Sequence, residues 1–250
     1  MTSAVATESA KPTQELVTKL QSAFGSDLIS VILYGSAAAG DYNPQYSDYN
    51  VLCVLREITP VQLRVSEPVM RWWREKGNPS PLMLTVEEVR HSTDCFPVEF
   101  HDILEYHRVL FGEDVTAEME IGDVFYRAQV EHDLRAKLLR LRQKASGIHS
   151  DKDVLRRLLT DSVATFCVLI RHVLILSGDT APARKRDVVT RAQDSLGIDA
   201  GPFLTLLDLR EDRVKAKAVD PDTLLAAYMK EVEKVIGVVN ALGNEKGATR

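Results

Sequence analysis

VILYGS, residues 31–36, is an apolar run that passes directly into a Gly-Ser pair. Together with the apolar residues from Leu28 onward, it predicts a buried strand over 28–34. A strand that ends in Gly-Ser presents backbone N–H groups and a hydroxyl at a tight turn, and such donors stabilise a bound anion. Gly35 permits close approach of the backbone, and the Ser36 hydroxyl can donate to a phosphate oxygen. The stretch therefore predicts a phosphate-binding turn.

A second apolar run, Val51–Leu55, follows Asp48-Tyr49-Asn50 and predicts a second buried strand. Side chains alternate along a strand, so Asp48 and Asn50 point to the same face. Two oxygen-bearing side chains are thus expected beside the phosphate-binding turn. Mg²⁺ takes hard oxygen ligands and bridges protein carboxylates to substrate phosphates. The pattern therefore favours metal-assisted transfer of a phosphoryl or nucleotidyl group.

Shorter elements complete the first half of the chain. Periodicity and turn residues predict two helices and one short strand, at 12–24, 60–76 and 81–84. Thr85, with Glu88 three residues later, has the capping-box pattern that begins a helix. Residues 96–104 are a third candidate strand, because apolar and charged side chains interleave there.

The second half of the chain contains only helical patterns. The expected helices are 126–145, 151–176, 184–196, 202–209 and 221–242. The fold class is therefore α+β, with an α/β-type domain built on a mixed sheet and then an all-α helical bundle. We expect the following division: a disordered leader over 1–11, the α/β-type domain over 12–120, the bundle over 121–243 and a disordered tail over 244–250.

The two strands and their turn resemble the nucleotidyltransferase superfamily typified by DNA polymerase beta. Its motif is an apolar residue, Gly-Ser, a spacer and Asp-x-Asp on the next strand, with a third carboxylate on a later strand. This chain has Gly35-Ser36, a spacer over 37–47, and then Asp48-Tyr49-Asn50. The order of parts is similar to that of two-domain bacterial members such as aminoglycoside and lincosamide adenylyltransferases.

Glu99 is our choice for the third carboxylate of the resemblance. It stands between Val98 and Phe100 in the third candidate strand. On a regular strand the side chain of Asp102 would face the other way.

The resemblance implies a function and a set of site residues. An active member would transfer a nucleoside monophosphate, AMP from ATP in the first instance, to a hydroxyl of a small molecule or a protein, using one or two Mg²⁺ ions. Gly35 and Ser36 would bind the phosphates of the nucleoside triphosphate. Asp48, Asn50 and Glu99 would be the metal ligands, and Asp48 and Glu99 the catalytic residues, with Glu99 as ligand or general base.

Asn50 departs from the pattern, because the family has a carboxylate there. An amide oxygen can coordinate a cation, but it carries no charge and does not bridge two cations. One unit charge about 4 Å from an ion corresponds to roughly 4 kcal/mol per charge product at an effective dielectric near 20. Two interpretations therefore stand beside each other: a nucleotidyltransferase, or a catalytically impaired nucleotide-binding or partner-binding protein of the same fold with a regulatory, antitoxin-like role.

Other polar residues give weaker patterns. Arg142 and His149 fit the loose Arg-x4-6-His spacing of helical RNases, for which chance is the better explanation. Residues 184–186, Arg-Lys-Arg, predict a solvated face, with a contact to a triphosphate or an acidic partner as the alternative. The histidines, His107 among them, show no metal-ligand spacing, so structural or surface roles are expected.

Charge and hydropathy limit the partners. The formal net charge of -5 argues against general nucleic-acid binding. The most apolar stretch, 163–176, is shorter than the roughly 20 residues of a membrane span and contains Arg171 and His172. With no secretory pattern at the start, we expect a cytoplasmic protein without membrane association. Neither the acceptor nor the oligomeric state can be predicted.

Overall fold

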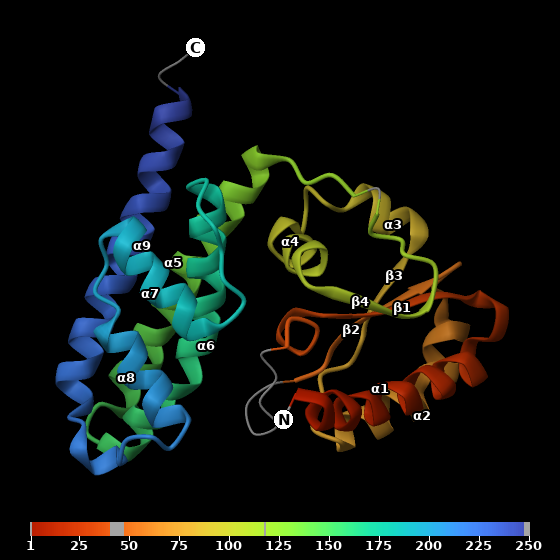
Figure 1. Cartoon of the computed structure of the whole chain (residues 1–250), viewed down its shortest axis with the longest axis horizontal. Helices are drawn as coiled ribbons and strands as arrows, with labels where there is room; N and C mark the ends of the chain where they lie inside the picture. The colour runs from red at the N-terminus through yellow and green to blue at the C-terminus, as the bar shows by residue number, and fades with distance from the viewer. Residues whose placement is uncertain (1, 41–47, 118, 248–250) are drawn as a thin grey trace. The chain divides into compact units, whose positions relative to one another are not determined.

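Two compact units make up the chain, residues 1–122 and 123–250. A computed structural model of the chain describes residues 2–40, 48–117 and 119–247. The first unit combines a sheet with helices, whereas the described part of the second is helical (Figure 1). The α+β fold class with a following helical bundle is confirmed.

In the described part of the chain, the strands form a four-stranded mixed sheet in the order β3-β2-β1-β4. Its strands are β1 (Leu28–Tyr34), β2 (Asn50–Leu55), β3 (Leu82–Thr85) and β4 (His107–Gly112). β1 pairs antiparallel with both β2 and β4, whereas β2 and β3 run parallel. The strands predicted over 28–34 and 51–55 are confirmed, and the strand expected at 81–84 lies one residue later.

Helices cover both faces of the sheet (Figure 1): α1 (Thr2–Phe24) and α2 (Pro60–Glu75) on one, and α3 (Val86–His91) and α4 (Pro97–Glu105) on the other. The alternation along β1 explains this arrangement. Val31 and Leu33 pack with Leu20 of α1 and Trp73 of α2, whereas Ile32 packs on the α3 and α4 side. Because both faces are buried, β1 is apolar at successive positions.

Capping boxes begin α2 and α3. At α3 the Glu88 N–H donates to the Thr85 hydroxyl over 3.1 Å, and the Thr85 N–H donates to the Glu88 carboxylate over 2.7 Å. Thr59 and Gln62 make the corresponding box at α2. These reciprocal bonds satisfy N–H groups that a helix start leaves unpaired. The helix start predicted at Thr85 is confirmed.

The prediction of a third strand over 96–104 was wrong, because residues 97–105 form the helix α4. Pro97 stands in the first turn, where proline suits a helix, and the buried side chains of Pro97, Phe100 and Ile103 recur every three residues, as on one side of a helix. Two apolar residues at i and i+2 were too few to distinguish the two periods. The strand that pairs with β1 is β4, directly after this helix.

Both ends of the chain are more helical than expected. α1 begins at Thr2 instead of Pro12, so the leader expected over 1–11 is helical from its second residue. Alanine, the best helix former, occurs three times in 1–11. At the other end α9 continues to Gly247, into the expected tail.

The second unit contains α5 (Asp123–Ile148), α6 (Lys152–Leu176), α7 (Lys185–Leu196), α8 (Gly201–Arg210) and α9 (Pro221–Gly247). Short 3-10 turns occur at Gly25–Asp27 and Ala216–Ala218. α6 packs against each of the other four helices. By length and hydropathy α6 could cross a membrane, but 56% of its most apolar window is buried in the protein, as in the core helix of a soluble protein.

Gly112, the last residue of β4, should be intolerant of a side chain. Its φ is +76°, and a Cβ would lie 1.9 Å from the Ile29 carbonyl oxygen. We expect Gly112→Ala to destabilise the first unit by about 2 kcal/mol or more beyond the cost of the left-handed backbone alone. Gly77→Ala is the matched control, because Gly77 has φ +86° with nothing near its Cβ position, and should cost only about 1–2 kcal/mol.

Urea unfolding followed by tryptophan fluorescence measures this difference. Both tryptophans of the chain, Trp72 and Trp73, lie in α2 and therefore report on the first unit. Equal losses of stability in the two variants would show that the close contact with β1 is not present.

Candidate functional site

The Gly-Ser turn follows β1 directly, as a 3-10 turn over Gly35–Ala37 (η2). Gly35 has φ +74°, a conformation that residues with a side chain rarely adopt. Its N–H donates to the Tyr106 carbonyl over 3.1 Å, and its carbonyl accepts from the N–H groups of Ala38 and Ala39 over 3.0 and 2.9 Å. The turn is therefore held between β1 and the residue that joins α4 to β4.

The Asn50 side chain packs against this turn. A Cβ at Gly35 would lie 3.2 Å from Asn50 Nδ2, with no other heavy atom within 4 Å, so the amide nitrogen is nearer to Gly35 than the amide oxygen is. Asn50 is the first residue of β2 and lies directly opposite Tyr34, the last residue of β1. The structure therefore brings Gly35 and Asn50 together, as the sequence predicted.

Three side chains form a row across the sheet beside this turn. Tyr34 lies opposite Asn50 on β2 and opposite His107 on β4. Directly opposite residues of antiparallel strands project to the same face, so the row consists of Asn50, Tyr34 and His107. Asp48, two residues before Asn50, is exposed. The row lies on the face of the sheet that α3 and α4 cover, because Tyr34 packs with their cluster.

Glu99 lies on α4 rather than on a strand, and α4 contacts the Gly-Ser turn. On a helix, residues three apart share a side, so Glu99 and Asp102 lie on the same side of α4. The argument that set Asp102 aside was therefore wrong. Both carboxylates act on Tyr34: its pKa is raised to about 12, mainly by burial and then by the negative charges of Asp102 and Glu99.

The fit to magnesium follows from the donors at this end of the sheet. Among the described residues, no group of three or more His, Cys, Asp or Glu side chains could hold a metal ion. Mg²⁺ is usually bound through one or two carboxylates together with substrate phosphates and water. Asp48 and the Asn50 amide oxygen suit one ion that arrives with a triphosphate, but not two ions held by the protein alone.

In the second unit, the residues of the two weaker sequence patterns, Arg-x4-6-His and Arg-Lys-Arg, form ion pairs. Arg142 pairs with Glu233, and His149 Nε2 lies 3.7 Å from an Asp222 oxygen. Arg186 is 2.6 Å from Asp208 and 2.9 Å from Glu211. These contacts lie within the second unit, so they account for both arginines without a ligand.

Sequence reasoning missed a polar network at His107. His107 Nε2 lies 3.2 Å from Asp114 Oδ2 and 3.2 Å from Thr116 Oγ1, and the Thr116 hydroxyl donates to Asp114 Oδ1 over 2.6 Å. No spacing rule joins these residues, because the chain returns to His107 only after β4. The Asp-x-Thr turn after Gly112 was the only local signal.

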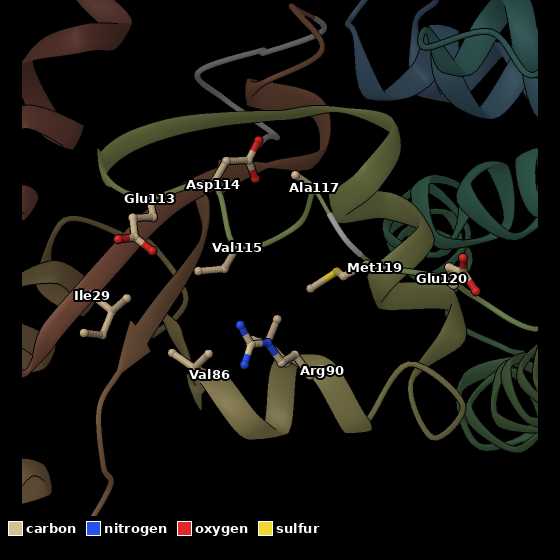
Figure 2. A pocket seen from close by; sticks show the side chains of 10 residues that line it. Ile29, Val86, Arg90, Glu113, Asp114, Val115, Ala117, Met119 and Glu120 are labelled. Carbon is tan, nitrogen blue, oxygen red and sulfur yellow. The ribbon is translucent and has the colours of Figure 1, made fainter.

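A cavity of about 420 Å³ lies on the same face of the sheet, between α3 and the segment that follows β4. Its lining is apolar at Ile29, Val86 and Met119, and Arg90 approaches from α3 on the side opposite Asp114 (Figure 2). None of the residues predicted for the phosphate and metal site lines this cavity. The cavity and the predicted site are therefore separate features of the unit.

Comparison with known proteins supports the fold. No protein-family model and no curated protein sequence matches the chain. Among solved structures, it is similar to spectinomycin adenyltransferase AAD(9) from Enterococcus faecialis, crystallised with ATP and spectinomycin, with a TM-score of 0.50 and 13% sequence identity. The similarity covers 92% of this chain and 97% of that one. The chain therefore has the same fold as that protein.

The raised pKa of Tyr34 predicts a pH dependence of stability. The ordinary tyrosine pKa is about 10, so the folded state holds the phenol proton more tightly than the unfolded state. This contribution is complete below pH 10 and is lost as the pH rises toward about 12. We expect Tyr34→Phe to lose less stability than the wild type over that interval, in urea unfolding followed by tryptophan fluorescence.

Cys53 titrates in the same interval, because burial raises the pKa of its thiol to about 12. It is present in both proteins, so their difference reports on Tyr34. Parallel profiles for the wild type and Tyr34→Phe would contradict the burial of the phenol beside α4.

Proposed function

We propose that this chain binds ATP at the Gly35-Ser36 turn and transfers AMP to a hydroxyl group with the help of Mg²⁺. The observation that carries the proposal is the pairing of Tyr34 with Asn50, which puts the turn beside Asn50 at the start of β2, two residues after Asp48. The similar spectinomycin adenyltransferase, crystallised with ATP and spectinomycin, supports a nucleotide donor and a hydroxyl-bearing acceptor.

Gly35 and Ser36 have different proposed roles in binding phosphate. The Gly35 N–H already donates to Tyr106, so the role of Gly35 is to set the backbone and leave space for Asn50. Because the N–H groups of Ala38 and Ala39 donate to the Gly35 carbonyl, the proposed donors to phosphate oxygens are the Ser36 hydroxyl and the N–H groups of Ser36 and Ala37. Each charge-assisted bond to a phosphate is stronger than a neutral one.

Asp48 and Asn50 are the proposed ligands of one Mg²⁺, whose chemistry is to neutralise phosphate charge and polarise the phosphorus centre. Asp48 supplies the only negative charge of this pair. Glu99 is proposed as the third acidic group of the site, acting from α4. Together these residues orient the triphosphate for attack by the acceptor hydroxyl.

A second candidate function is nucleotide or partner binding without turnover. Asn50 favours it, because the site lacks one charge of the family pattern. The lack of a three-carboxylate group among the described residues favours it as well. In this form the protein would act as a regulatory, antitoxin-like partner of the same fold.

The proposed acceptor is a small molecule or a protein with an accessible hydroxyl. We propose a cytoplasmic location, where ATP and Mg²⁺ are both available. The buried core helix α6 and the net charge of -5 are consistent with a protein that binds neither membranes nor nucleic acid in general.

ATP binding tests the site without knowledge of the acceptor. We expect isothermal titration with a non-hydrolysable ATP analogue to show binding that requires Mg²⁺, and Ser36→Ala and Asp48→Ala to weaken it by about tenfold or more, the effect of losing one charge-assisted contact. Ser80→Ala, at an exposed serine in the same unit, is the control and should bind as the wild type does. Equal binding by all four proteins, or by none, would contradict the proposed site.

Turnover separates the two candidate functions. With labelled ATP, Mg²⁺, and water or spectinomycin as the acceptor probe, a nucleotidyltransferase releases pyrophosphate. The restored carboxylate of Asn50→Asp should strengthen Mg²⁺ binding by at least about tenfold. Binding without pyrophosphate release in the wild type, together with release by Asn50→Asp, would identify the non-catalytic form.

A further inference from the structure

The network around His107 determines which ring nitrogen carries the proton. Thr116 has one hydroxyl hydrogen, and it is donated to Asp114 Oδ1 over 2.6 Å. His107 Nε2 therefore faces two acceptors, the lone pairs of the Thr116 hydroxyl and the Asp114 carboxylate, each at 3.2 Å. Only an Nε2–H group satisfies both. The neutral imidazole accordingly keeps its lone pair on Nδ1.

The buried Thr116 anchors the network, whereas the Asp114 carboxylate is exposed. Thr116 is 1% exposed, and its own N–H donates to Asp114 Oδ1 over 3.0 Å. Asp114 lies on the segment after β4 (Figure 2), and its pKa is lowered, mainly by the hydrogen bond from Thr116. The carboxylate is therefore ionised at neutral pH and orients the imidazole, as the carboxylate of a catalytic His–Asp pair does.

The register places this imidazole at the end of the sheet where Asn50 begins β2. Tyr34 lies between the two, directly opposite each of them. Neighbouring strands are about 4.8 Å apart, so Asn50 and His107 are separated by roughly 10 Å on one face. The half-buried Tyr34 side chain projects from the row between them. Within residues 2–40, 48–117 and 119–247, no hydrogen bond engages His107 Nδ1.

We infer that His107 is the general base of the reaction, and that Asp114 and Thr116 are its positioning residues. This inference rests on the proposed function. The acceptor oxygen forms a bond to the α-phosphorus of ATP while its proton moves to His107 Nδ1. The bond from that phosphorus to the α–β bridging oxygen breaks, and pyrophosphate leaves with the electron pair. The imidazolium then returns the proton to water.

A histidine base is also compatible with the negative charge that the site lacks because Asn50 replaces a carboxylate. A site with fewer carboxylates attracts cations less strongly, but a neutral imidazole needs no cation nearby to remain a base. The Asp114 carboxylate lies beside Nε2, the nitrogen that does not accept the proton. Its negative charge therefore stabilises the imidazolium as it forms. The proton-accepting role is thereby moved from α4 to β4.

The first test is independent of activity. Two-bond ¹H–¹⁵N correlation spectra of the ¹⁵N-labelled full chain, with His107→Gln used for assignment, should show His107 as the Nε2–H tautomer. Asp114→Asn should shift the balance toward Nδ1–H. An Nδ1–H tautomer in the wild type would overturn the inference, whether or not the protein turns over ATP.

The second test compares catalysis with binding, using pyrophosphate release with water or spectinomycin as the acceptor probe. We expect His107→Gln to lower kcat by about a hundredfold or more while the Kd for the ATP analogue stays within about twofold of the wild type. Asp114→Asn should lower kcat by about tenfold or more, and added imidazole should partly restore His107→Gly. His91→Gln, at an exposed histidine of α3, is the matched control and should retain the wild-type kcat.

The outcomes separate this inference from the proposed function. If Ser36→Ala abolishes turnover while His107→Gln leaves kcat unchanged, the nucleotidyltransferase function stands and the role of His107 is refuted. If the wild type binds no ATP, both fail together. A fall in ATP affinity that accounts for the whole effect of His107→Gln would also refute a role as general base.

Discussion

The antiparallel register of β1 with its two neighbours is the constraint on which the candidate chemistry of this molecule depends. It aligns Asn50, Tyr34 and His107 in one row at the end where the Gly-Ser turn begins. A slip of one residue would move the side chains of a strand to the opposite face. The buried side chains prevent such a slip, because Val31 and Leu33 would then exchange places with Ile32 and Tyr34 between two different helix layers.

Charge at this row distinguishes the two candidate functions. Around Asn50 the chain has one carboxylate and one amide where the family pattern has two carboxylates. A single Mg²⁺ that arrives with a triphosphate can be held by such a pair, since phosphates supply the remaining oxygens. In our inference the His107 network adds a neutral acceptor of protons on β4, on the other side of β1 from β2. The proposed transferase with one metal ion and a histidine base is therefore chemically coherent.

The two units were largely predictable from the sequence, and one element shows why the prediction had a limit. Strong periodic signals identified β1, β2 and the helices of the second unit with small errors at their ends. Residues 97–105 carried too few apolar positions to separate a helix from a strand, and the prediction failed there. The same error led to the wrong side for the Asp102 side chain, because residues three apart face opposite ways on a strand but share a side on a helix. β4, with its mixed pattern, was recognisable only through its pairing with β1.

The sequence by itself determined the apolar strand and the Gly-Ser turn, because these depend on neighbouring residues and on local backbone geometry. Tertiary structure decided which distant residues join them. Strand pairing brought His107 beside Tyr34, and the return of the chain after β4 brought Asp114 and Thr116 to the imidazole. Such contacts depend on strand register and on the path of a loop, and the spacing of residues along the chain predicts neither.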